Sequence, residues 1–592
     1  MSTYESHLNE SKYGYDMVVA VTQRAVDATI KQFLQNFEGK EFIACYQLNP
    51  DPNDNKKLYL PMDLDKVVAI AEMDPFSIPD TRDQDPAQRA AVTRLYDALF
   101  AFAFKAKMGI PEGFPISKIP STIILNKVGA EVTYNLYFQN MTILNIQEQR
   151  PYKWQNLSQS YDDESSVPWV FQFRVSLDFS TNNSVFANLP KSVQDKVKNL
   201  NPDSAFSVQQ LYLDLNTALL TSNPAIIGLD PDGPAAYYLS KIFINNYYEQ
   251  LKSGSVSPTN PNGYFLLGYG ILPTKPSTTN PSIIPTDLTI SVSPFYDDSR
   301  TLHVSDQFEN YTLNYLVMTR GATMPPPYPF VWNWLDSSQV RDYHGAMSIR
   351  KEVFTQFLLD LLSPSLKNIC LVPIPYIHVN AISAEWSLDF KKTTDPQRYK
   401  PVTDPLSNTK VLTFFYTAYA EAKDDWGKFI TWGNISATVT VQSDIYLENN
   451  LIKTDTTGTV NCHINIEGGV TAGNFVKYNT KTSYEIGVDQ NGNLKAKMAP
   501  GSPAFTDQSD QINPNGWSKF VTFGEINGVI DGLRKDMESM KEFLKGFDRQ
   551  IEQMLNGSGV WVFPGGKTFV FKDVHFSNFQ DLTAHLTYVE PT

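Results

Sequence analysis

A long stretch of alternating residues, 372–498, constrains the fold most strongly. Every second residue is apolar in segments such as 435–441 and 460–466. Because successive side chains of a β-strand point to opposite faces, this period predicts strands that bury one face. Asn491-Gly492 separates two such segments and is typical of a hairpin turn. We therefore expect this part of the chain to be all β.

Two other stretches show the period of a helix instead. Residues 16–37 contain neither Gly nor Pro, and we expect one helix there that ends near Gly39. We expect a second regular helix that begins after Ser348, with Ser348 as its N-cap, and that ends at Pro364. The apolar side chains that share one face of the first helix are Val19, Val26, Ile30, Phe33 and Phe37.

The longest predicted helix covers residues 522–555. Its apolar residues recur at spacings of three and four, an average of about 3.5, which aligns them in one seam. With a rise of about 1.5 Å per residue, this helix would be roughly 50 Å long. The seam consists of Ile530, Leu533, Met537, Met540, Leu544, Phe547, Ile551 and Met554.

The first two helices divide the chain into two halves. Tyr343-His-Gly-Ala-Met347 echoes Tyr13-Gly-Tyr-Asp-Met17, and each pentapeptide precedes a predicted helix. An internal repeat would explain the echo, but ordinary helical periodicity is the simpler explanation. We expect two large units, residues 1–320 and 340–592, each of which combines helices with sheet.

Composition excludes several classes of protein. The 592 residues carry 63 acidic and 49 basic side chains, a formal net charge of −14, so nucleic acid is not an expected partner. Three cysteines far apart in the sequence cannot form a disulfide scaffold, and we interpret them as buried thiols in a reducing compartment. The polar start has no features of a signal peptide, and no apolar run reaches about 18 residues. We expect a cytoplasmic protein as synthesised, for which non-classical release stays open.

Motifs that carry chemistry are present only as fragments. Residues 564–568 resemble the end of a P-loop, but Trp561 stands where its first glycine is needed. Residues 489–493 begin like a calcium loop and lack its later glycine and glutamate. Cys462 and His463 are neighbours on a predicted strand and point to opposite faces, so they cannot share a metal. We predict no catalytic residue, metal or cofactor. An enzyme would need a site assembled across the fold.

The predicted helices and sheets favour a different role. A curved sheet around an apolar helix leaves an elongated seam, which either packs fully as core or takes up an acyl chain. The residues that we expect to line it are Val26, Ile30, Phe33, Phe37, Leu533, Met537, Met540, Leu544 and Phe547.

Two segments carry a resemblance to a known family. Tyr13-Gly-Tyr-Asp-Met-Val-Val19 resembles the opening of the OrfX and forty-seven-kilodalton proteins, which are encoded in botulinum neurotoxin clusters and related insecticidal toxin loci. Met347-Ser-Ile-Arg350, which runs into residues 353–366, is similar to an internal helix of that family. The resemblance implies the TULIP (tubular lipid-binding) fold, with long helices wrapped by antiparallel sheet. It also implies a lipid-binding or toxin-accessory protein.

These observations give one prediction with two alternatives. We expect a β-dominated α+β protein with TULIP-like units, in which long amphipathic helices are wrapped by curved antiparallel sheets. It would bind a lipid or another hydrophobic small molecule, or dock on a membrane surface or a toxin protein. The alternatives are an assembly protein whose helices are fully packed and an enzyme with a site assembled across the fold.

Overall fold

The computed structural model describes most of the chain, and every structural statement below concerns those residues. It covers residues 3–507, Arg549 and residues 560–589. The gaps are residues 36–40, 52–57, 127–130, 148–152, most of 182–205, 223–229, 245–264 and 274–284, then 297–307, 381–383, 395–398, 403–408, 428–430, 468–469, 503 and 564–566.

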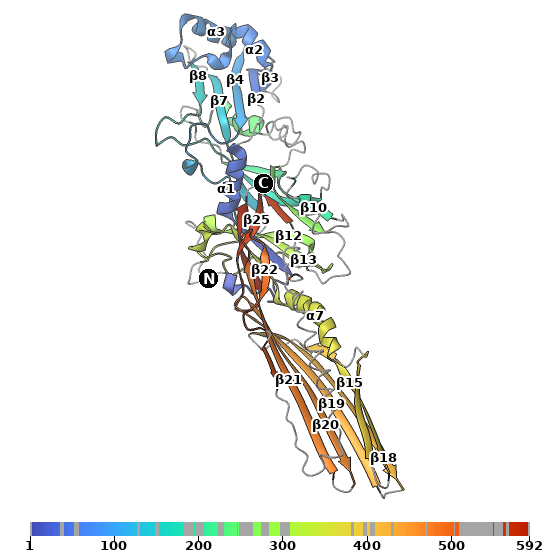
Figure 1. The fold of residues 1–592 in the computed structure, drawn as a ribbon. Coiled ribbons are helices and arrows are strands. Elements are labelled where there is room, and N and C mark those ends of the chain that lie inside the picture. Colours follow the sequence, from blue (N-terminus) through green and yellow to red (C-terminus); the bar gives the residue numbers. More distant parts are fainter. Residues whose placement is uncertain are drawn as a thin grey trace.

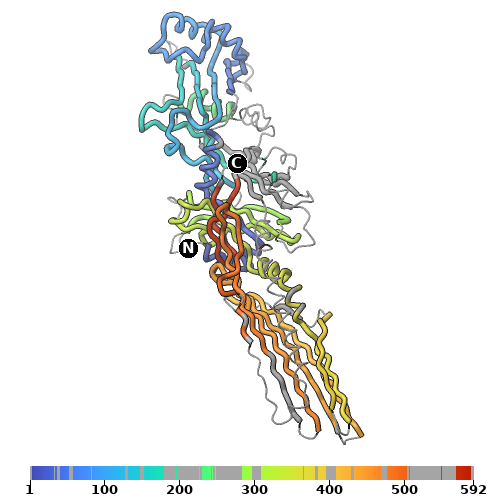
Figure 2. Tube along the Cα trace, viewed as in Figure 1, coloured from blue at the N-terminus to red at the C-terminus, as the bar shows by residue number. Residues whose placement is uncertain are grey.

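Antiparallel sheets follow one another along an elongated body (Figure 1). A five-stranded sheet forms one end, a twelve-stranded sheet the middle, and a seven-stranded sheet of long strands the other end. Both chain ends lie in the middle part (Figure 2). The β-dominated architecture with several antiparallel sheets is confirmed, whereas sheets wrapped around long helices are not seen among the described residues.

The five-stranded sheet carries two helices, α2 (Leu64–Ala71) and α3 (Pro86–Asp97), on one face. Helix α3 starts at Pro86, because Asp85 and Gln88 form a reciprocal capping box in front of it. The alternating segment that follows α3 forms a strand of this sheet. The sheet order is β3 (Tyr59–Met62), β2 (Phe42–Leu48), β4 (Phe100–Met108), β7 (Phe138–Gln147) and β8 (Lys153–Ser158).

The twelve-stranded sheet joins segments from the whole length of the chain. Its order is β12 (Pro285–Ser293), β13 (Thr312–Thr319), β1 (Met17–Thr22), β14 (Gly345–Ile349), β26 (Leu582–Val589), β25 (Lys567–Phe576), β24 (Val560–Phe563), β11 (Phe265–Pro273), β10 (Phe206–Ser222), β9 (Phe171–Thr181), β6 (Glu131–Leu136) and β5 (Ile123–Leu125). The predicted units 1–320 and 340–592 therefore share one sheet, because β1 pairs with β14. The division into these units stays a prediction.

The first predicted helix begins later than expected. Residues 17–22 form β1, and α1 covers only Gln23–Gln35. Valine-rich β1 is buried on both faces between β13 and β14, so tertiary pairing decides its conformation. Val19 thus belongs to a strand, and the prediction of one helix over 16–37 was wrong for its first third.

An approximate two-fold relation connects two strand–helix units. β1 leads into α1, and β14 leads into α7 (Lys351–Asn368). The two strands pair antiparallel with Val19 opposite Met347, so the helices leave the sheet in opposite directions (Figure 1). The side chain before each strand accepts a hydrogen bond from a backbone amide of a neighbouring strand. Asp16, before β1, accepts from Thr319 of β13, and His344, before β14, accepts from Tyr588 of β26. The corresponding residues of the two units are offset by two positions from the sequence echo, so the internal repeat stays a prediction.

Helix α7 departs from its predicted ends. Ser348 lies in β14 rather than at the cap, and Arg350 is the residue before the first turn. Pro364 does not end the helix, which continues for another turn to Asn368. A short helix, α5 (Pro234–Tyr238), begins at Pro234 and continues as a π-helix at Leu239–Phe243. No described helix has the length and apolarity needed to cross a membrane.

The predicted all-β region, 372–498, is confirmed. Its seven-stranded sheet contains β17 (Tyr399–Val402), β18 (Lys410–Trp426), β19 (Thr431–Glu448), β20 (Leu451–Ile466), β21 (Val470–Val488) and β22 (Leu494–Met498), and β23 (Ala504–Asp507) pairs with β21. A ribbon of β15 (Leu371–Val379) and β16 (Ala384–Lys392) packs beside it. The hairpin turn at Asn491-Gly492 is also confirmed, with φ of 78° at Gly492. The long helix predicted over 522–555 lies outside the described residues.

Candidate functional site

One apolar cluster extends through the sheets, and we call it the apolar seam. It contains Ala25, Val26, Ile30 and Leu34 of α1 and seven side chains of α7, from Val353 to Leu366. It continues into Phe42 and Phe104 at one end of the body and Val439 and Tyr484 at the other. A continuous apolar interior therefore runs through all three large sheets.

The predicted site residues fall into two groups. Val26 and Ile30 are buried in the apolar seam, on the face of α1 that the sequence predicted. Phe33 lies on α1, but its side chain is outside the described residues. Phe37, Leu533, Met537, Met540, Leu544 and Phe547 also lie outside the described residues. The ligand-binding role of all nine residues stays a prediction.

The polar face of α1 is anchored by buried side chains. Asp27 accepts hydrogen bonds from the amide and hydroxyl of Thr122, at 2.5 and 2.7 Å. Lys31 pairs with Asp27 at 2.9 Å and donates to the carbonyl of Ile119 at 2.8 Å. Gln23 accepts from the amide of Leu125. These contacts fix the rotation of α1, so that Val26 and Ile30 face the seam.

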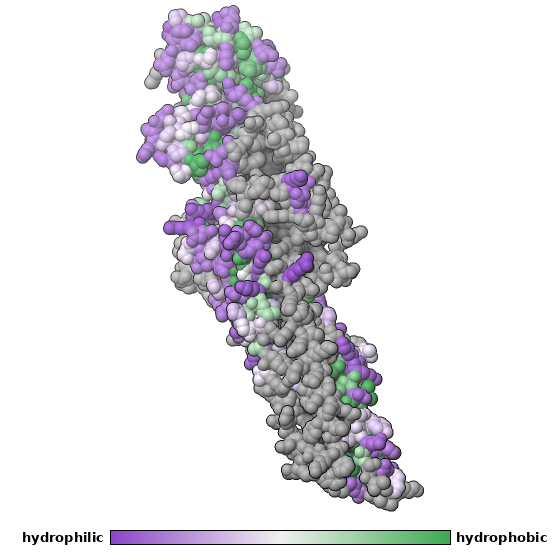
Figure 3. Space-filling model, viewed as in Figure 1, coloured by the Kyte–Doolittle hydropathy of each residue, from purple (hydrophilic) through white to green (hydrophobic). Residues whose placement is uncertain are grey.

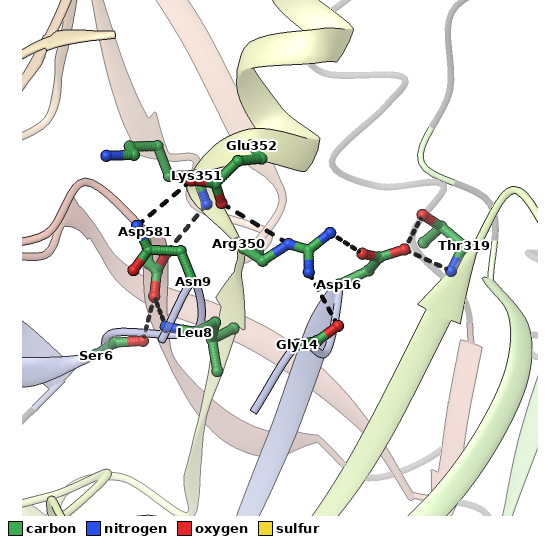
Figure 4. Close-up of polar contacts among 10 residues, drawn as sticks. All are labelled: Ser6, Leu8, Asn9, Gly14, Asp16, Thr319, Arg350, Lys351, Glu352 and Asp581. Atoms are coloured by element: carbon green, nitrogen blue, oxygen red, sulfur yellow. Dashed lines mark hydrogen bonds and ion pairs between the residues drawn. The ribbon is translucent and has the colours of Figure 1, made fainter. Parts of the chain in front are cut away.

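Helix α7 is seated by an ion pair at its start. Arg350 Nη2 lies 2.7 Å from Asp16 Oδ1, and Arg350 Nη1 donates to the carbonyl of Gly14 (Figure 4). The other carboxylate oxygen of Asp16 accepts from the amide and hydroxyl of Thr319, at 2.9 and 2.6 Å. One buried carboxylate thus ties together the residues that precede β1, end β13 and precede α7.

A second carboxylate lies beside the first turn of α7. Asp581 is fully buried, and it accepts from the amides of Leu8 and Lys351 and from the hydroxyl of Ser6 (Figure 4). Burial raises the pKa of Asp581 to about 6, and the three hydrogen bonds oppose that rise. Its place at a helix N-terminus also favours the negative charge. The N-terminal segment, α7 and the last hairpin therefore meet at Asp581.

Two buried histidines contact Thr3 and Tyr4, the first residues that the structure describes. The hydroxyl of Thr3 lies 3.2 Å from the Nε2 atoms of both His575 and His585. Tyr4 stacks on His575, and His585 Nδ1 lies 3.3 Å from Asp573. Burial, with a smaller contribution from His585, lowers the pKa of His575 to about 4. Thr3 is itself fully buried, so this array holds the N-terminal segment and offers no substrate access.

The other face of the central sheet is covered by aromatic side chains. Tyr13 packs against Tyr328, Phe330 and Trp332, and its hydroxyl accepts from the amide of Val331. The hydroxyl of Tyr15 donates to the carbonyl of Pro326. The tyrosines of the Tyr13-Gly-Tyr15 motif therefore fasten the Pro-rich segment onto the sheet.

The described residues show little of the chemistry that an enzyme needs. Among them, no group of three His, Cys, Asp or Glu side chains is arranged to hold a metal ion. Cys45, Cys370 and Cys462 are free and buried as predicted, and burial raises the pKa of each thiol to about 11 or 12. Thiols with raised pKa values are poor nucleophiles. Cys462 is buried and His463 exposed, as expected for neighbours on a strand.

Comparison with known proteins adds little beyond the geometry. No protein-family model matches the chain, and no curated protein matches it. One of the solved structures that match is a lipopolysaccharide binding protein, with 7% sequence identity over 98% of this chain and 100% of that one. The TM-score is 0.27, too low for the likeness to support an argument about fold or ligand.

Sequence reasoning missed the polar groups that join the distant segments. Asp16 and Arg350 lie in the two segments that carry the family resemblance, and only their opposite charges indicated a contact. Asp581, His575 and His585 had no local signature, because their partners come from the opposite end of the chain. For the two histidines, the signal that could have found them is an ionisable residue among the apolar residues of a strand.

Proposed function

We propose that the chain binds a lipid or another hydrophobic ligand along the apolar seam. The observation that supports this proposal is the continuity of the seam, which follows α1 and α7 in opposite directions from the middle of the body. An acyl chain is long, thin and apolar, and an elongated apolar interior between helices and sheets suits that shape. In this proposal α1, α7 and the adjoining sheets act as TULIP-like units.

The proposal also covers the toxin-accessory role that the resemblance implies. Its two motifs, at Asp16 and Arg350, contact each other through the ion pair that seats α7. Residues of the resemblance thereby support the proposed ligand site, whatever partner the chain accompanies. A carrier of a hydrophobic ligand that accompanies a toxin is consistent with this arrangement.

The first test is extraction of the natively purified protein. Protein isolated without detergent is treated with organic solvent, and the extract is analysed by mass spectrometry. We expect lipid at close to one molecule per chain. A delipidated protein should then take up a fluorescent fatty acid. A folded protein that yields no lipid and takes up none would sink the proposal and favour fully packed helices.

A pair of substitutions separates a ligand channel from a packed core. Ile30→Trp places a larger side chain in the seam. Filling a channel displaces ligand with little loss of stability, whereas overfilling a packed core costs about 1–3 kcal/mol. Leu316→Trp is the matched control, because Leu316 is equally buried but lies on the other face of the sheet, against Tyr13 and Trp332. We expect Ile30→Trp to lose ligand and Leu316→Trp to lose stability while it retains ligand.

A further inference from the structure

The far end of the seven-stranded sheet carries two exposed tryptophans. Trp426 ends β18 and Trp432 lies at the start of β19, on either side of the hairpin turn (Figure 1). Their exposed fractions are 42% and 39%. Turns and strand ends at protein surfaces are usually polar, so two large aromatic side chains at one hairpin end require an explanation.

The two tryptophans project from opposite faces of the hairpin. From Leu412 onward the buried residues of β18 are even-numbered, such as Tyr416 and Ala418, so Trp426 belongs to the inner face. The register places Trp432 opposite Asp425, which is an exposed residue of the outer face. A flat protein surface covers one face of a hairpin. Aromatic side chains on both faces suit a medium that surrounds the strand end.

The charged side chains beside Trp432 indicate which chemical group would contact it. Asp425 lies directly across one side of it, and on the other side the amide of Glu467 donates to the Trp432 carbonyl. Both carboxylate side chains are exposed. An indole between two carboxylates attracts a cation that is itself weakly hydrated, and a quaternary ammonium has this property. The same carboxylates repel an anionic surface.

Strand β15 packs against the described residues at this end of the sheet. Gly433, next to Trp432, lies under β15, where an added Cβ would be 2.7 Å from side-chain atoms of both Ile377 and Val379. Asp424, next to Asp425, accepts from the amide of Val379 and pairs with His378, both at 2.9 Å. Strand β15 therefore braces the hairpin from the inner side. Figure 3 shows apolar side chains interrupting the hydrophilic surface on this lower part of the body.

We propose that this end of the molecule docks on a zwitterionic bilayer whose headgroups carry choline, with Trp426 and Trp432 at the membrane interface. Indole rings favour that interface, because their apolar body enters the acyl boundary while the N–H stays hydrated. The quaternary ammonium of choline lies over Trp432, between Asp425 and Glu467. This docking is independent of the ligand proposed for the apolar seam.

The test is flotation of the full-length protein with phosphatidylcholine vesicles. We expect the wild type to float with them, and Trp426→Ala with Trp432→Ala to reduce the bound fraction about ten-fold. Tyr419→Ala is the matched control, because Tyr419 is 60% exposed on the outer face of the same strand but away from its end. It should bind within about two-fold of wild type. Equal flotation of the double variant would overturn the proposal.

A second pair of measurements tests the choline headgroup. Asp425→Asn with Glu467→Gln should weaken binding to phosphatidylcholine vesicles and improve binding to vesicles that contain phosphatidylserine. A wild type that floats only with phosphatidylserine vesicles would contradict the headgroup assignment. If it ignores all vesicles but binds a lysine-rich peptide through Trp432, the partner is a protein and the proposal is wrong. Lipid extracted from the seam is measured in the same samples, so the two proposals fail independently.

Discussion

The guanidinium of Arg350 lies 2.7 Å from the carboxylate of Asp16, and both side chains are largely buried. The pair connects the residue before β1 with the residue before α7, the corresponding ends of the two strand–helix units. Each charge has further partners, Thr319 for Asp16 and Gly14 for Arg350. Removal of either charge therefore leaves the other one buried and incompletely compensated.

Arg350→Met should destabilise the fold by about 3 kcal/mol, because breaking a buried pair strands one charge. Urea unfolding measures the change. Arg174→Met is the matched control, since Arg174 pairs with Glu131 at 3.2 Å with both side chains about half exposed. Its cost should be below about 1 kcal/mol. Similar losses of unfolding free energy in the two variants would show that the Asp16–Arg350 pair stabilises the fold no more than an exposed pair does.

The buried His575 should make stability depend on pH. Its pKa is about 4 in the folded protein and 6.5 in the reference state, with Thr3, Tyr4, His585 and Asp573 around the ring. Below pH 6.5 the unfolded chain takes up a proton that the folded one refuses, so stability falls as pH drops from 6.5 to 4. The loss reaches at most about 3 kcal/mol.

His575→Gln retains a partner for Thr3 and should remove this loss. The measurement is the difference in unfolding free energy between variant and wild type, followed from pH 7 to pH 4. Asp581 has the opposite sign, because its raised pKa lets the folded protein take up a proton first between pH 6 and 3.8. The comparison with the variant cancels that contribution. A difference that does not change with pH would rule out His575 as the source.

The hairpin turn at Gly492 should tolerate no side chain. Its φ is 78°, and an added Cβ would lie 2.4 Å from Cβ of Val570 on β25. Gly492→Ala should therefore cost about 3 kcal/mol, the left-handed strain plus overpacking. Gly501 has a φ of 80° and nothing within 4 Å, so Gly501→Ala should cost only about 1 kcal/mol. Thermal unfolding of the two variants compares them, and equal losses would exclude the contact with Val570.

Pro364 occupies an exposed position inside α7. It has no amide to donate to the carbonyl of Asp360, and proline costs about 3 kcal/mol in an ideal helix. Pro364→Ala should stabilise the fold by about 1 kcal/mol, since a helix already bent around proline recovers only part of that cost. A lower melting temperature for the variant would mean that the packing of Leu361 and Leu366 needs the bend.

Local patterns predicted the elements that depend on local chemistry. The hairpin at Asn491-Gly492 and the alternating strands of 372–498 were both predicted correctly, because propensity and period agree there. The strand β1 was read as helix, because its valines also fit a helical face. Its conformation depends on β13 and β14, hundreds of residues away, and no local signal reports that pairing.

The candidate site was predictable only in part for the same reason. The apolar face of α1 at Val26 and Ile30 could be read from spacing, since a helix buries one side. The contacts that orient that face, such as Asp27 with Thr122, join residues whose proximity follows from the fold alone. The family resemblance, the two-unit division and the roles of the nine proposed residues stay predictions.

The pairing order of the central sheet also dictates when the protein can be completed during synthesis. β14 is flanked by β1, which emerges before it, and by β26, which emerges long after it. The five-stranded end can form from consecutive residues while translation continues, and so can the long hairpins of the opposite end. β14 keeps one open edge until residue 589 has left the ribosome, and an open edge recruits other strands. A chain truncated before β25 should therefore accumulate as aggregate even though both ends of its body are already folded.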